Sequence, residues 1–423
     1  MAALSLFQEI PMVPFTETAV LNAAYINDLS PNKMYLGNRE YCTDNGQPWI
    51  LPVVRKVQQQ MIKDPTLNHE YLPVLGLAEF NRVATALILG KDSIAIVEKR
   101  ADSVQVPGGN GAVCMGAQFL KQWYSITHPK SPVIYVSLPC WANHASAFAE
   151  AGFNNIFGYR YWDGEKLHLA IHQWLEDLEN APEYSIVVLH IAAHQPTAMD
   201  PNPTEWRQIA EVMKRKQLFP FFYVTAQGLA SGDLNKDAWP VRHFVTERFE
   251  LFCAQSFSRN FGLYNDSIGS LTIVTRNNHT LIRVRSQMAI AARYTWSNPP
   301  RYGARIVATV LNNPAFFAEW QENLKAMAER LMLTKEKLKE ELRTLGTPGH
   351  WEHITKQIGT YIFPGFTDSQ IDYLMNKSHI YLSVNGQINV SKVNSQNLAY
   401  VAHCIHEAVV SSPEDDESEP DKQ

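Results

Sequence analysis

The sequence predicts an α/β protein with a mainly parallel central sheet, followed by a smaller α+β domain. Between Tyr71 and Val310, short apolar runs alternate with amphipathic helical patterns. A long helical pattern comes next, and the residues after it, to about Val410, return to short strands mixed with helices. Because consecutive parallel strands need a crossover between them, usually a helix, this alternation indicates a parallel sheet covered by helices on both faces.

The chain before this region is rich in loops. Ile10–Phe15 is an extended apolar segment whose prolines exclude the interior of a helix. We expect this arm to be covered by another part of the protein, such as a second subunit. A helical pattern then opens at Pro52, with Val53, Val54 and Val57 on one face.

Six apolar runs in the alternating region have the length of buried strands. The expected strands are Ile94–Val97, Val133–Val136, Ile186–His190, Phe219–Val224, Glu250–Ala254 and Ser270–Val274. Helical stretches lie between them, with Ala112–Trp123 and Pro203–Arg215 as clear examples.

The last third of the chain begins with one long helical pattern. Apolar residues recur at helical spacing from Pro314 to Leu345, and Gly346 and Pro348 end the pattern. The elements expected after it are strands near Ile358–Phe363, Ile380–Leu382 and Gln387–Val390, and helices at Thr367–Lys377 and Ser395–Val409.

These patterns divide the chain into four expected parts. Residues 1–49 form an N-terminal arm and part of the small domain, 50–325 the large domain, 326–410 the small C-terminal domain, and 411–423 an acidic tail. The tail carries about the whole formal net charge of -5 and has no aromatic or β-branched residue, so we expect it to be disordered.

Composition narrows the functional class. The chain has 423 residues, of which 45% are hydrophobic and 19% charged, as in ordinary soluble proteins with two domains. The negative net charge argues against nucleic acid as a main partner, and no apolar run approaches the ~20 residues of a membrane helix. The five cysteines are dispersed without a C-x-x-C pair, which indicates reduced thiols in the cytoplasm and no metal site.

A glycine-rich turn is the first candidate binding site. Gly108, Gly109 and Asn110 follow an apolar run and open a helical pattern. Free backbone N–H groups and the helix dipole at such a turn suit a phosphate group. The same residues also fit a plain turn, and the sequence alone leaves both interpretations open.

Trp141 follows an expected strand, and Arg293 precedes the rigid loop Tyr294–Pro300. Trp141 can stack on a flat heterocycle or belong to the core, and Arg293 can bind a carboxylate or remain a surface cation. The loops that contain Gln195 and Ala226 hold no clear acid, base or nucleophile. On the residues alone, the chain is a cytosolic α/β protein with a candidate phosphate pocket.

Four segments and one loop carry a resemblance to a known family. They are Asp64–Pro73, Gly158–Asp163, Leu175–Pro182, Thr295–Pro300 and the loop Cys253–Tyr264. From about Phe7 to Val409 the chain resembles the aspartate aminotransferases, which use pyridoxal 5'-phosphate (PLP) to move an amino group between L-aspartate and 2-oxoglutarate. The resemblance implies PLP fold type I, the cofactor PLP, amino acid and dicarboxylate ligands, and a homodimer with active sites at the subunit seam.

Part of the site implied by the family is kept. Trp141 matches the ring that stacks on PLP, and Gly108, Gly109 and Ser256 match phosphate contacts, with Asn110 in place of a threonine. The residues that reach into the neighbouring subunit's site in the family are matched by Tyr71, Arg293 and Ser297.

The positions that carry the chemistry are changed. Arg259 stands at the position of the family's Schiff-base lysine, and Tyr223 stands at the position of the aspartate that binds the pyridine nitrogen. In the family an asparagine and a tyrosine bind the cofactor's phenolic oxygen, and these positions are occupied here by Gln195 and Ala226. Ser267 replaces the arginine that clamps the phosphate, and Gln387 replaces the arginine that binds the substrate α-carboxylate. At the entrance, Asn38, Arg39 and Glu40 replace the family's Val-Gly-Ala.

The change at position 259 has the largest consequence. Guanidinium stays protonated, so Arg259 cannot act as the amine nucleophile, and covalent PLP attachment there is not expected. A phenol at Tyr223 supplies no charge at neutral pH.

Three hypotheses follow. The chain is an aspartate aminotransferase homologue with weak or absent transamination. Alternatively it is a non-catalytic binding or regulatory subunit that pairs with an active cytosolic paralogue, or a sensor in which Arg259, Ser256 and the Gly108–Gly109 turn hold a phosphate or dicarboxylate non-covalently.

Overall fold

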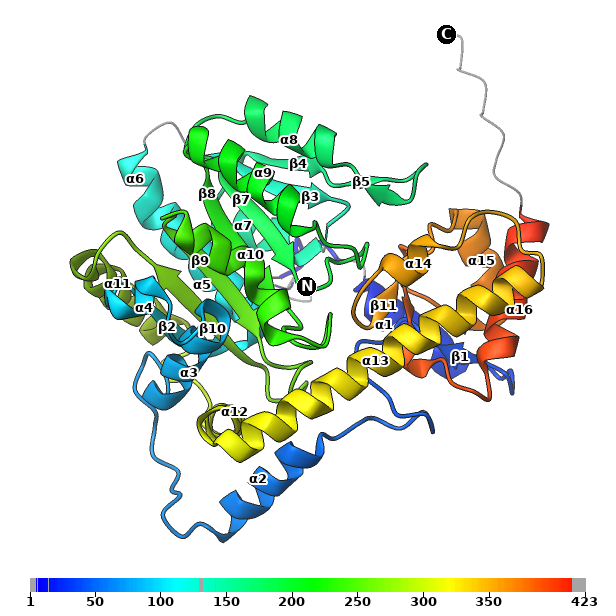
Figure 1. Ribbon diagram of the computed structural model, residues 1–423, viewed down its shortest axis with the longest axis horizontal. Helices are drawn as coiled ribbons and strands as arrows, with labels where there is room; N and C mark the ends of the chain where they lie inside the picture. The colour runs from blue at the N-terminus through cyan, green and yellow to red at the C-terminus, as the bar shows by residue number, and fades with distance from the viewer. Residues whose placement is uncertain (1–4, 6, 14, 129–131, 141, 413–423) are drawn as a thin grey trace.

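A computed structural model describes residues 5, 7–13, 15–128, 132–140 and 142–412. A central sheet covered by helices forms the larger part of the molecule, and a smaller group of helices and short strands lies beside it (Figure 1). The long helix α13 (Pro314–Thr344) runs from the larger part into the smaller one. The acidic tail expected from residue 411 lies, from residue 413 onward, outside the described residues.

The sheet has seven strands in the order β2-β10-β9-β8-β7-β3-β4. Their bounds are β2 Ala101–Pro107, β10 Ile268–Val274, β9 Leu251–Ser256, β8 Phe219–Val224, β7 Ile186–Ile191, β3 Ile134–Leu138 and β4 Ile156–Arg160. The pairs from β9 to β4 are parallel, while β10 is antiparallel to both β2 and β9. The mainly parallel sheet that the alternation predicted is therefore confirmed.

Both faces of the sheet are buried, as continuous apolar strands require. In β7, Val187 and Leu189 belong to the core under α8, α9 and α10, whereas Ile186 and Val188 belong to the core under α5, α7 and α11. Tyr223 of β8 faces the second of these cores. The helices around the sheet are α2 Pro52–Lys63, α3 Ala78–Leu89, α4 Ile94–Val97, α5 Gly108–Phe119 with a π-turn Leu120–Tyr124, α6 Ser125–Thr127, α7 Ala142–Glu150, α8 Ile171–Asn180, α9 Pro203–Arg215, α10 Leu234–Thr246, α11 Asn278–Thr295 and α12 Tyr302–Asn312.

The smaller part joins both ends of the chain. Strand β1 (Met34–Tyr35) pairs with β12 (Ile380–Tyr381), and β11 (Tyr361–Ile362) pairs with β13 (Ile388–Asn389). The helices here are α1 Glu17–Asn27, α14 His353–Lys356, a 3-10 turn Val390–Lys392, α15 Asp368–Asn376 and α16 Leu398–Ser411. Two further short strands, β5 Trp162–Asp163 and β6 His168–Leu169, form a hairpin beside the main sheet.

One expected strand was wrong, and two strands of the main sheet were missed. The expected strand Ile94–Val97 is the helical turn α4, in which Ala95 is fully buried while Val97 is 67% exposed. A four-residue apolar run carries too little periodicity to separate a strand from a helical turn. The strand in this place is β2, which begins at Ala101, and β4 was also missed.

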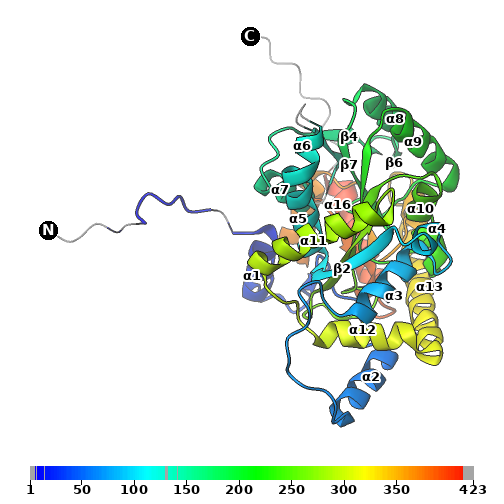
Figure 2. The same cartoon turned by 90° about the vertical axis from the view of Figure 1, so that its left-hand side faces the viewer.

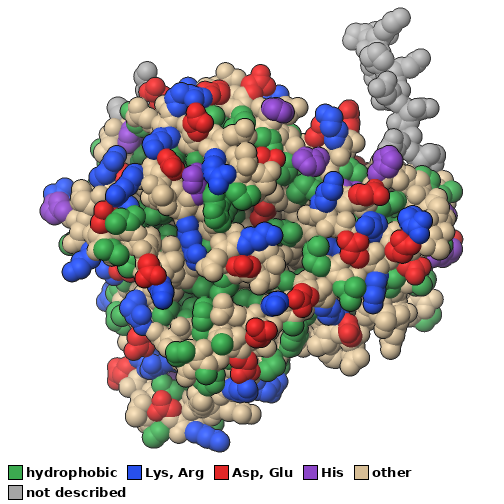
Figure 3. All heavy atoms as spheres, in the orientation of Figure 1, with side chains coloured by type: hydrophobic (Ala, Val, Ile, Leu, Met, Phe, Trp, Pro, Cys, Tyr) green, Lys and Arg blue, Asp and Glu red, His purple; other side chains and the backbone are tan. Residues whose placement is uncertain are grey.

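The N-terminal arm extends away from the body (Figure 2). Its apolar side chains are open to solvent, with Met12 97%, Phe15 83% and Val13 80% exposed. Exposed apolar surface of this kind marks an interaction site. On the face seen in Figure 3, basic and acidic side chains are interspersed. None of the described helices is both long and apolar enough to cross a membrane.

Candidate functional site

The candidate residues meet at the edge of the sheet where the parallel strands end. Ser256 is the last residue of β9, and Gly269 lies opposite it on the antiparallel β10. Pro107 lies opposite Ile268, so the turn into α5 and Ser267 reach the same edge. Loops at the carboxyl ends of parallel strands form the binding sites of open α/β sheets.

The glycine turn is packed tightly against this edge. A Cβ atom on Gly109 would lie 3.0 Å from the Tyr223 hydroxyl and 3.2 Å from the Ser256 Cβ. Gly108, at φ +68°, would place a Cβ atom 3.5 Å from the Ser267 Cβ. The structure thus brings Gly108, Gly109, Tyr223, Ser256 and Ser267 together, while the next residue on the helix, Asn110, is exposed.

The N-cap residue of α5 provides no side-chain cap. The residue before the helix, Pro107, makes no side-chain hydrogen bond to it. The first N–H groups of a helix have no partner within the helix, and the positive end of the dipole lies there. The Ser256 hydroxyl accepts a hydrogen bond from the Ser258 N–H at 3.3 Å and lies beside the turn. This arrangement suits an anion.

Tyr223 fills the floor of the site. Its side chain is 4% exposed, and its ring meets those of His144 and His190 edge-on, with centroids 4.6 Å and 5.1 Å apart. Burial raises the pKa of the phenol well above 10. Tyr223 is therefore a neutral group at physiological pH.

Three buried histidines lie behind Tyr223. Burial lowers the pKa of His144 to about 3, and it lowers the pKa values of His190 and His194 well below their usual range. His194 is held between the hydroxyls of Ser137 at 2.8 Å and Thr197 at 2.9 Å. These rings are neutral hydrogen-bonding groups.

The loop after β7 is fixed by a buried carboxylate. Asp200 accepts hydrogen bonds from the N–H groups of Ala193 at 3.0 Å and His194 at 2.8 Å, and burial raises its pKa to about 6. The Gln195 N–H donates to His190 Nδ1 at 3.3 Å. Asp200 thereby holds the loop that presents Gln195.

Arg259 points toward Gln195 and Tyr361. Its guanidinium carbon lies 5.3 Å from the centroid of the Tyr361 ring, within cation–π range. The Gln195 amide, oriented with its oxygen toward the guanidinium, accepts from Nη1 at 3.2 Å and Nη2 at 2.9 Å. Arg259 is half-buried. No pattern in the sequence marked Tyr361 as a member of the site.

Gln387 and Ala226 offer little to a ligand. The Gln387 amide donates to the Pro196 carbonyl at 2.7 Å and is 8% exposed. Ala226 is 3% exposed and belongs to an apolar core. At the entrance, the Asn38 carbonyl accepts from the Tyr361 hydroxyl at 3.2 Å, and Arg39 is exposed.

Three predicted residues form no hydrogen bond or ion pair with this group in the described part of the chain. Tyr71 is 86% exposed, and Arg293 is exposed in the last turn of α11. Ser297 donates to Asn298 Oδ1 at 3.0 Å, and Asn298 donates to the Leu72 carbonyl at 2.6 Å, which ties the two segments together. Trp141 lies outside the described residues.

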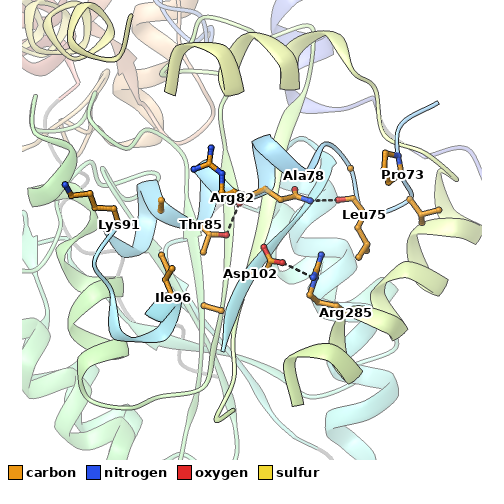
Figure 4. A pocket seen from close by; sticks show the side chains of 14 residues that line it. Pro73, Leu75, Ala78, Arg82, Thr85, Lys91, Ile96, Asp102 and Arg285 are labelled. Atoms are coloured by element: carbon orange, nitrogen blue, oxygen red, sulfur yellow. Dashed lines mark hydrogen bonds and ion pairs between the residues drawn. The ribbon is translucent and has the colours of Figure 1, made fainter. Parts of the chain in front are cut away.

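A pocket of 710 Å³ opens elsewhere on the molecule, between α3, β2 and α11 (Figure 4). Arg285 and Asp102 form an ion pair of 2.9 Å on its wall. None of the predicted site residues lines it. The volume of this pocket therefore does not identify the position of the candidate site.

Comparison with known proteins gives the family. The chain matches the family "Aminotransferase class I and II" over residues 31–405. It is 52% identical over 407 residues to "Aspartate aminotransferase, cytoplasmic" of Gallus gallus, which covers 96% of this chain and 99% of that protein. It is 41% identical over 409 residues to the Bos taurus protein named "Putative aspartate aminotransferase, cytoplasmic 2", with coverage of 97% and 98%.

A solved structure agrees with this assignment. The crystal structure of an aromatic-amino-acid aminotransferase from Burkholderia pseudomallei, covalently bound to pyridoxal phosphate, superposes with a TM-score of 0.91 and 33% identity. The match covers 96% of this chain and 100% of that chain. The fold is fold type I of the PLP-dependent transferases, and the chain belongs to the class I and II aminotransferase family.

Proposed function

We propose that the chain is an aspartate aminotransferase homologue in which transfer of the amino group from L-aspartate to 2-oxoglutarate, giving oxaloacetate and L-glutamate, is weak or absent. One observation carries the proposal: a guanidinium, Arg259, occupies the position that the resemblance assigns to the covalent lysine. A guanidinium is neither an amine nucleophile nor a proton shuttle. The relatives' names support the family reaction and a cytoplasmic location.

The site fits one end of PLP and not the other. The uncapped start of α5, Gly109 and the Ser256 hydroxyl suit a phosphate. At the reactive end, Arg259 supplies no amine, and the neutral phenol of Tyr223 supplies no negative charge for a ring nitrogen. We therefore expect PLP to be held through its phosphate and without a covalent bond at position 259.

One buried amine could be mistaken for a substitute. Lys335 on α13 is 0% exposed, and burial lowers its pKa to about 7, so a large fraction is neutral at physiological pH. Its Nζ donates to the Gln357 carbonyl at 2.9 Å. Without exposed surface this amine has no route to a ligand, which argues against a role as the missing nucleophile.

The test is covalent capture. The purified chain is mixed with PLP, reduced with borohydride and mapped by mass spectrometry, while oxaloacetate formation from L-aspartate and 2-oxoglutarate is measured in parallel. We expect no pyridoxyl adduct in the pocket and little or no oxaloacetate. An adduct on a single lysine together with turnover at the level of the Gallus gallus enzyme would overturn the proposal.

A second candidate function is a non-catalytic or regulatory subunit. The exposed Tyr71 and Arg293 and the half-buried Ser297 favour it, since the resemblance assigns these residues to a neighbouring subunit's site. The homodimer is the first expectation, and a heterodimer with an active cytosolic paralogue is the alternative. Co-expression of the two chains with different affinity tags, followed by tandem purification, tests it: without a mixed dimer the alternative fails.

A further inference from the structure

Arg259 is a half-buried cation without an acidic partner in the described part of the chain. No carboxylate oxygen of these residues lies within 4.0 Å of its guanidinium. Its contacts are the neutral oxygen of Gln195 and the face of the Tyr361 ring. A charge that is partly withdrawn from water and not paired is costly. A ligand carboxylate would relieve that cost.

Three acids of the surrounding segments have hydrogen-bond partners other than Arg259. Asp200 accepts the backbone hydrogen bonds of Ala193 and His194, and Glu40 accepts from the Asn38 amide at 2.9 Å. Asp237 accepts from the Gly228 N–H at 2.7 Å and from the Ser231 hydroxyl. None of these carboxylates pairs with Arg259, so its charge is left for a ligand.

The rings on the inner side of Arg259, those of His190, Tyr223 and Tyr264, are neutral. The charge of Arg259 adds to burial in lowering the pKa of His190, and it opposes the rise that burial causes in the pKa values of Tyr223 and Tyr264. The exposed Arg39 at the entrance also acts on Tyr223. The charge of Arg259 therefore acts on the rings that surround it, and a guanidinium in such a position attracts anions.

A second positive pole lies close by. Ser256, beside the uncapped start of α5, precedes Arg259 by three residues, so the two Cα atoms are at most ~10 Å apart. A helix start and a guanidinium at this spacing suit the two ends of one small dianion. Arg259 presents a planar fork, which matches the geometry of a carboxylate.

We propose that Arg259 binds one carboxylate of a small organic dicarboxylate non-covalently, with Gln195 and Tyr361 as the walls of the site and the start of α5 beside its second carboxylate. This proposal rests on the proposed function, because it requires that no covalently attached cofactor occupies the pocket beside Arg259. In a protein without efficient turnover, such binding would be the working activity of the site.

The test uses the full chain without added PLP. Succinate is the probe, with acetate as the monocarboxylate and inorganic phosphate as the non-carboxylate anion, and binding is measured by calorimetry and thermal shift. We expect succinate to bind more tightly than acetate or phosphate. Arg259→Gln should raise its Kd at least tenfold, while Arg343→Gln, which removes an exposed arginine at the end of α13, should leave it unchanged.

A gain-of-charge variant checks the geometry independently. Gln195→Glu would place a fixed carboxylate against the guanidinium, and we expect it to raise the Tm without ligand and to abolish succinate binding. Succinate affinity that is the same in Arg259→Gln, or phosphate binding as tight as succinate binding, overturns the proposal. Because no cofactor is present, a negative result leaves the capture experiment and its conclusion intact.

Discussion

At the scale of single residues, two side chains decide what the site can do. Arg259 keeps the positive charge at its position but gives up the amine, and Tyr223 replaces an acid implied by the family with a phenol that burial keeps neutral. Both changes act on one reaction. Covalent attachment and proton transfer need an amine at position 259, and stabilisation of the charge that develops needs an acid at position 223. Their effects on activity should therefore depend on each other.

Restoring the lysine at position 259 and then the aspartate at position 223 should recover transamination in two steps. We expect Arg259→Lys to form a pyridoxyl adduct at position 259 after borohydride reduction but to remain ~10²-fold or more below the Gallus gallus enzyme in kcat/KM. Adding Tyr223→Asp should raise kcat/KM above either single variant. The measurement is coupled oxaloacetate production. If Arg259→Lys alone reaches the activity of the Gallus gallus enzyme, position 223 and the other changed residues matter less than we infer.

The contact of Gly109 with Tyr223 makes a separate prediction about packing. A methyl group at position 109 would lie 3.0 Å from the Tyr223 hydroxyl and 3.2 Å from the Ser256 Cβ, both closer than ordinary contacts. We expect Gly109→Ala to lower the free energy of unfolding by ~1–3 kcal/mol, as overpacking of a buried site does. Gly164→Ala is the control, because no atom lies within 4 Å of its added methyl group. Urea unfolding that shows equal effects for both variants would contradict the geometry.

At the scale of the elements, α13 carries an ionisable group, Lys335, that is completely buried. Burial lowers the pKa of Lys335 from 10.5 to about 7. Between these values the unfolded chain binds a proton that the folded chain does not, so the free energy of unfolding rises with pH across this window. Below pH 7 the buried amine is charged in both states and destabilises the fold.

Lys335→Met should remove this dependence. Relative to the variant, the wild type should gain about 1.4 kcal/mol of unfolding free energy per pH unit across the window. The exposed Lys337→Met should show no such trend. Urea unfolding between pH 6.5 and 10 measures it, and a difference between Lys335→Met and wild type that stays constant with pH would rule out titration of Lys335.

The elements also show how far the sequence could predict the fold. The expected bounds of Phe219–Val224 and Pro203–Arg215 match β8 and α9, since strands buried on both faces and capped helices leave clear patterns. Ile94–Val97 was wrong because four apolar residues fit either a strand or a helical turn. In the site, the glycine turn could be predicted as an anion site. Tyr361 could not, because its contact with Arg259 crosses from the smaller part of the molecule to the larger one.

At the scale of the whole molecule, the N-terminal arm makes the strongest case for a second chain. Met12, Phe15 and Val13 are each at least 80% exposed. Burying a side chain of this kind contributes ~1.5–3 kcal/mol, so a few of them can decide whether two chains stay together. Tyr71 and Arg293 are exposed as well, and the proposed dimer would give them a partner.

Removing the arm tests the dimer directly. We expect the full chain to sediment as a dimer and deletion of residues 1–15 to raise the dimer dissociation constant at least tenfold, because the arm's apolar side chains lose their cover. The double variant Met12→Ser with Phe15→Ser should weaken the dimer in the same direction without shortening the chain. Analytical ultracentrifugation over a range of concentrations measures both. A full chain that stays monomeric at micromolar concentration would remove the dimer, and with it the role proposed for Tyr71 and Arg293. A dimer that the deletion leaves unchanged would instead place the interface on other surfaces and leave the exposed arm without a function.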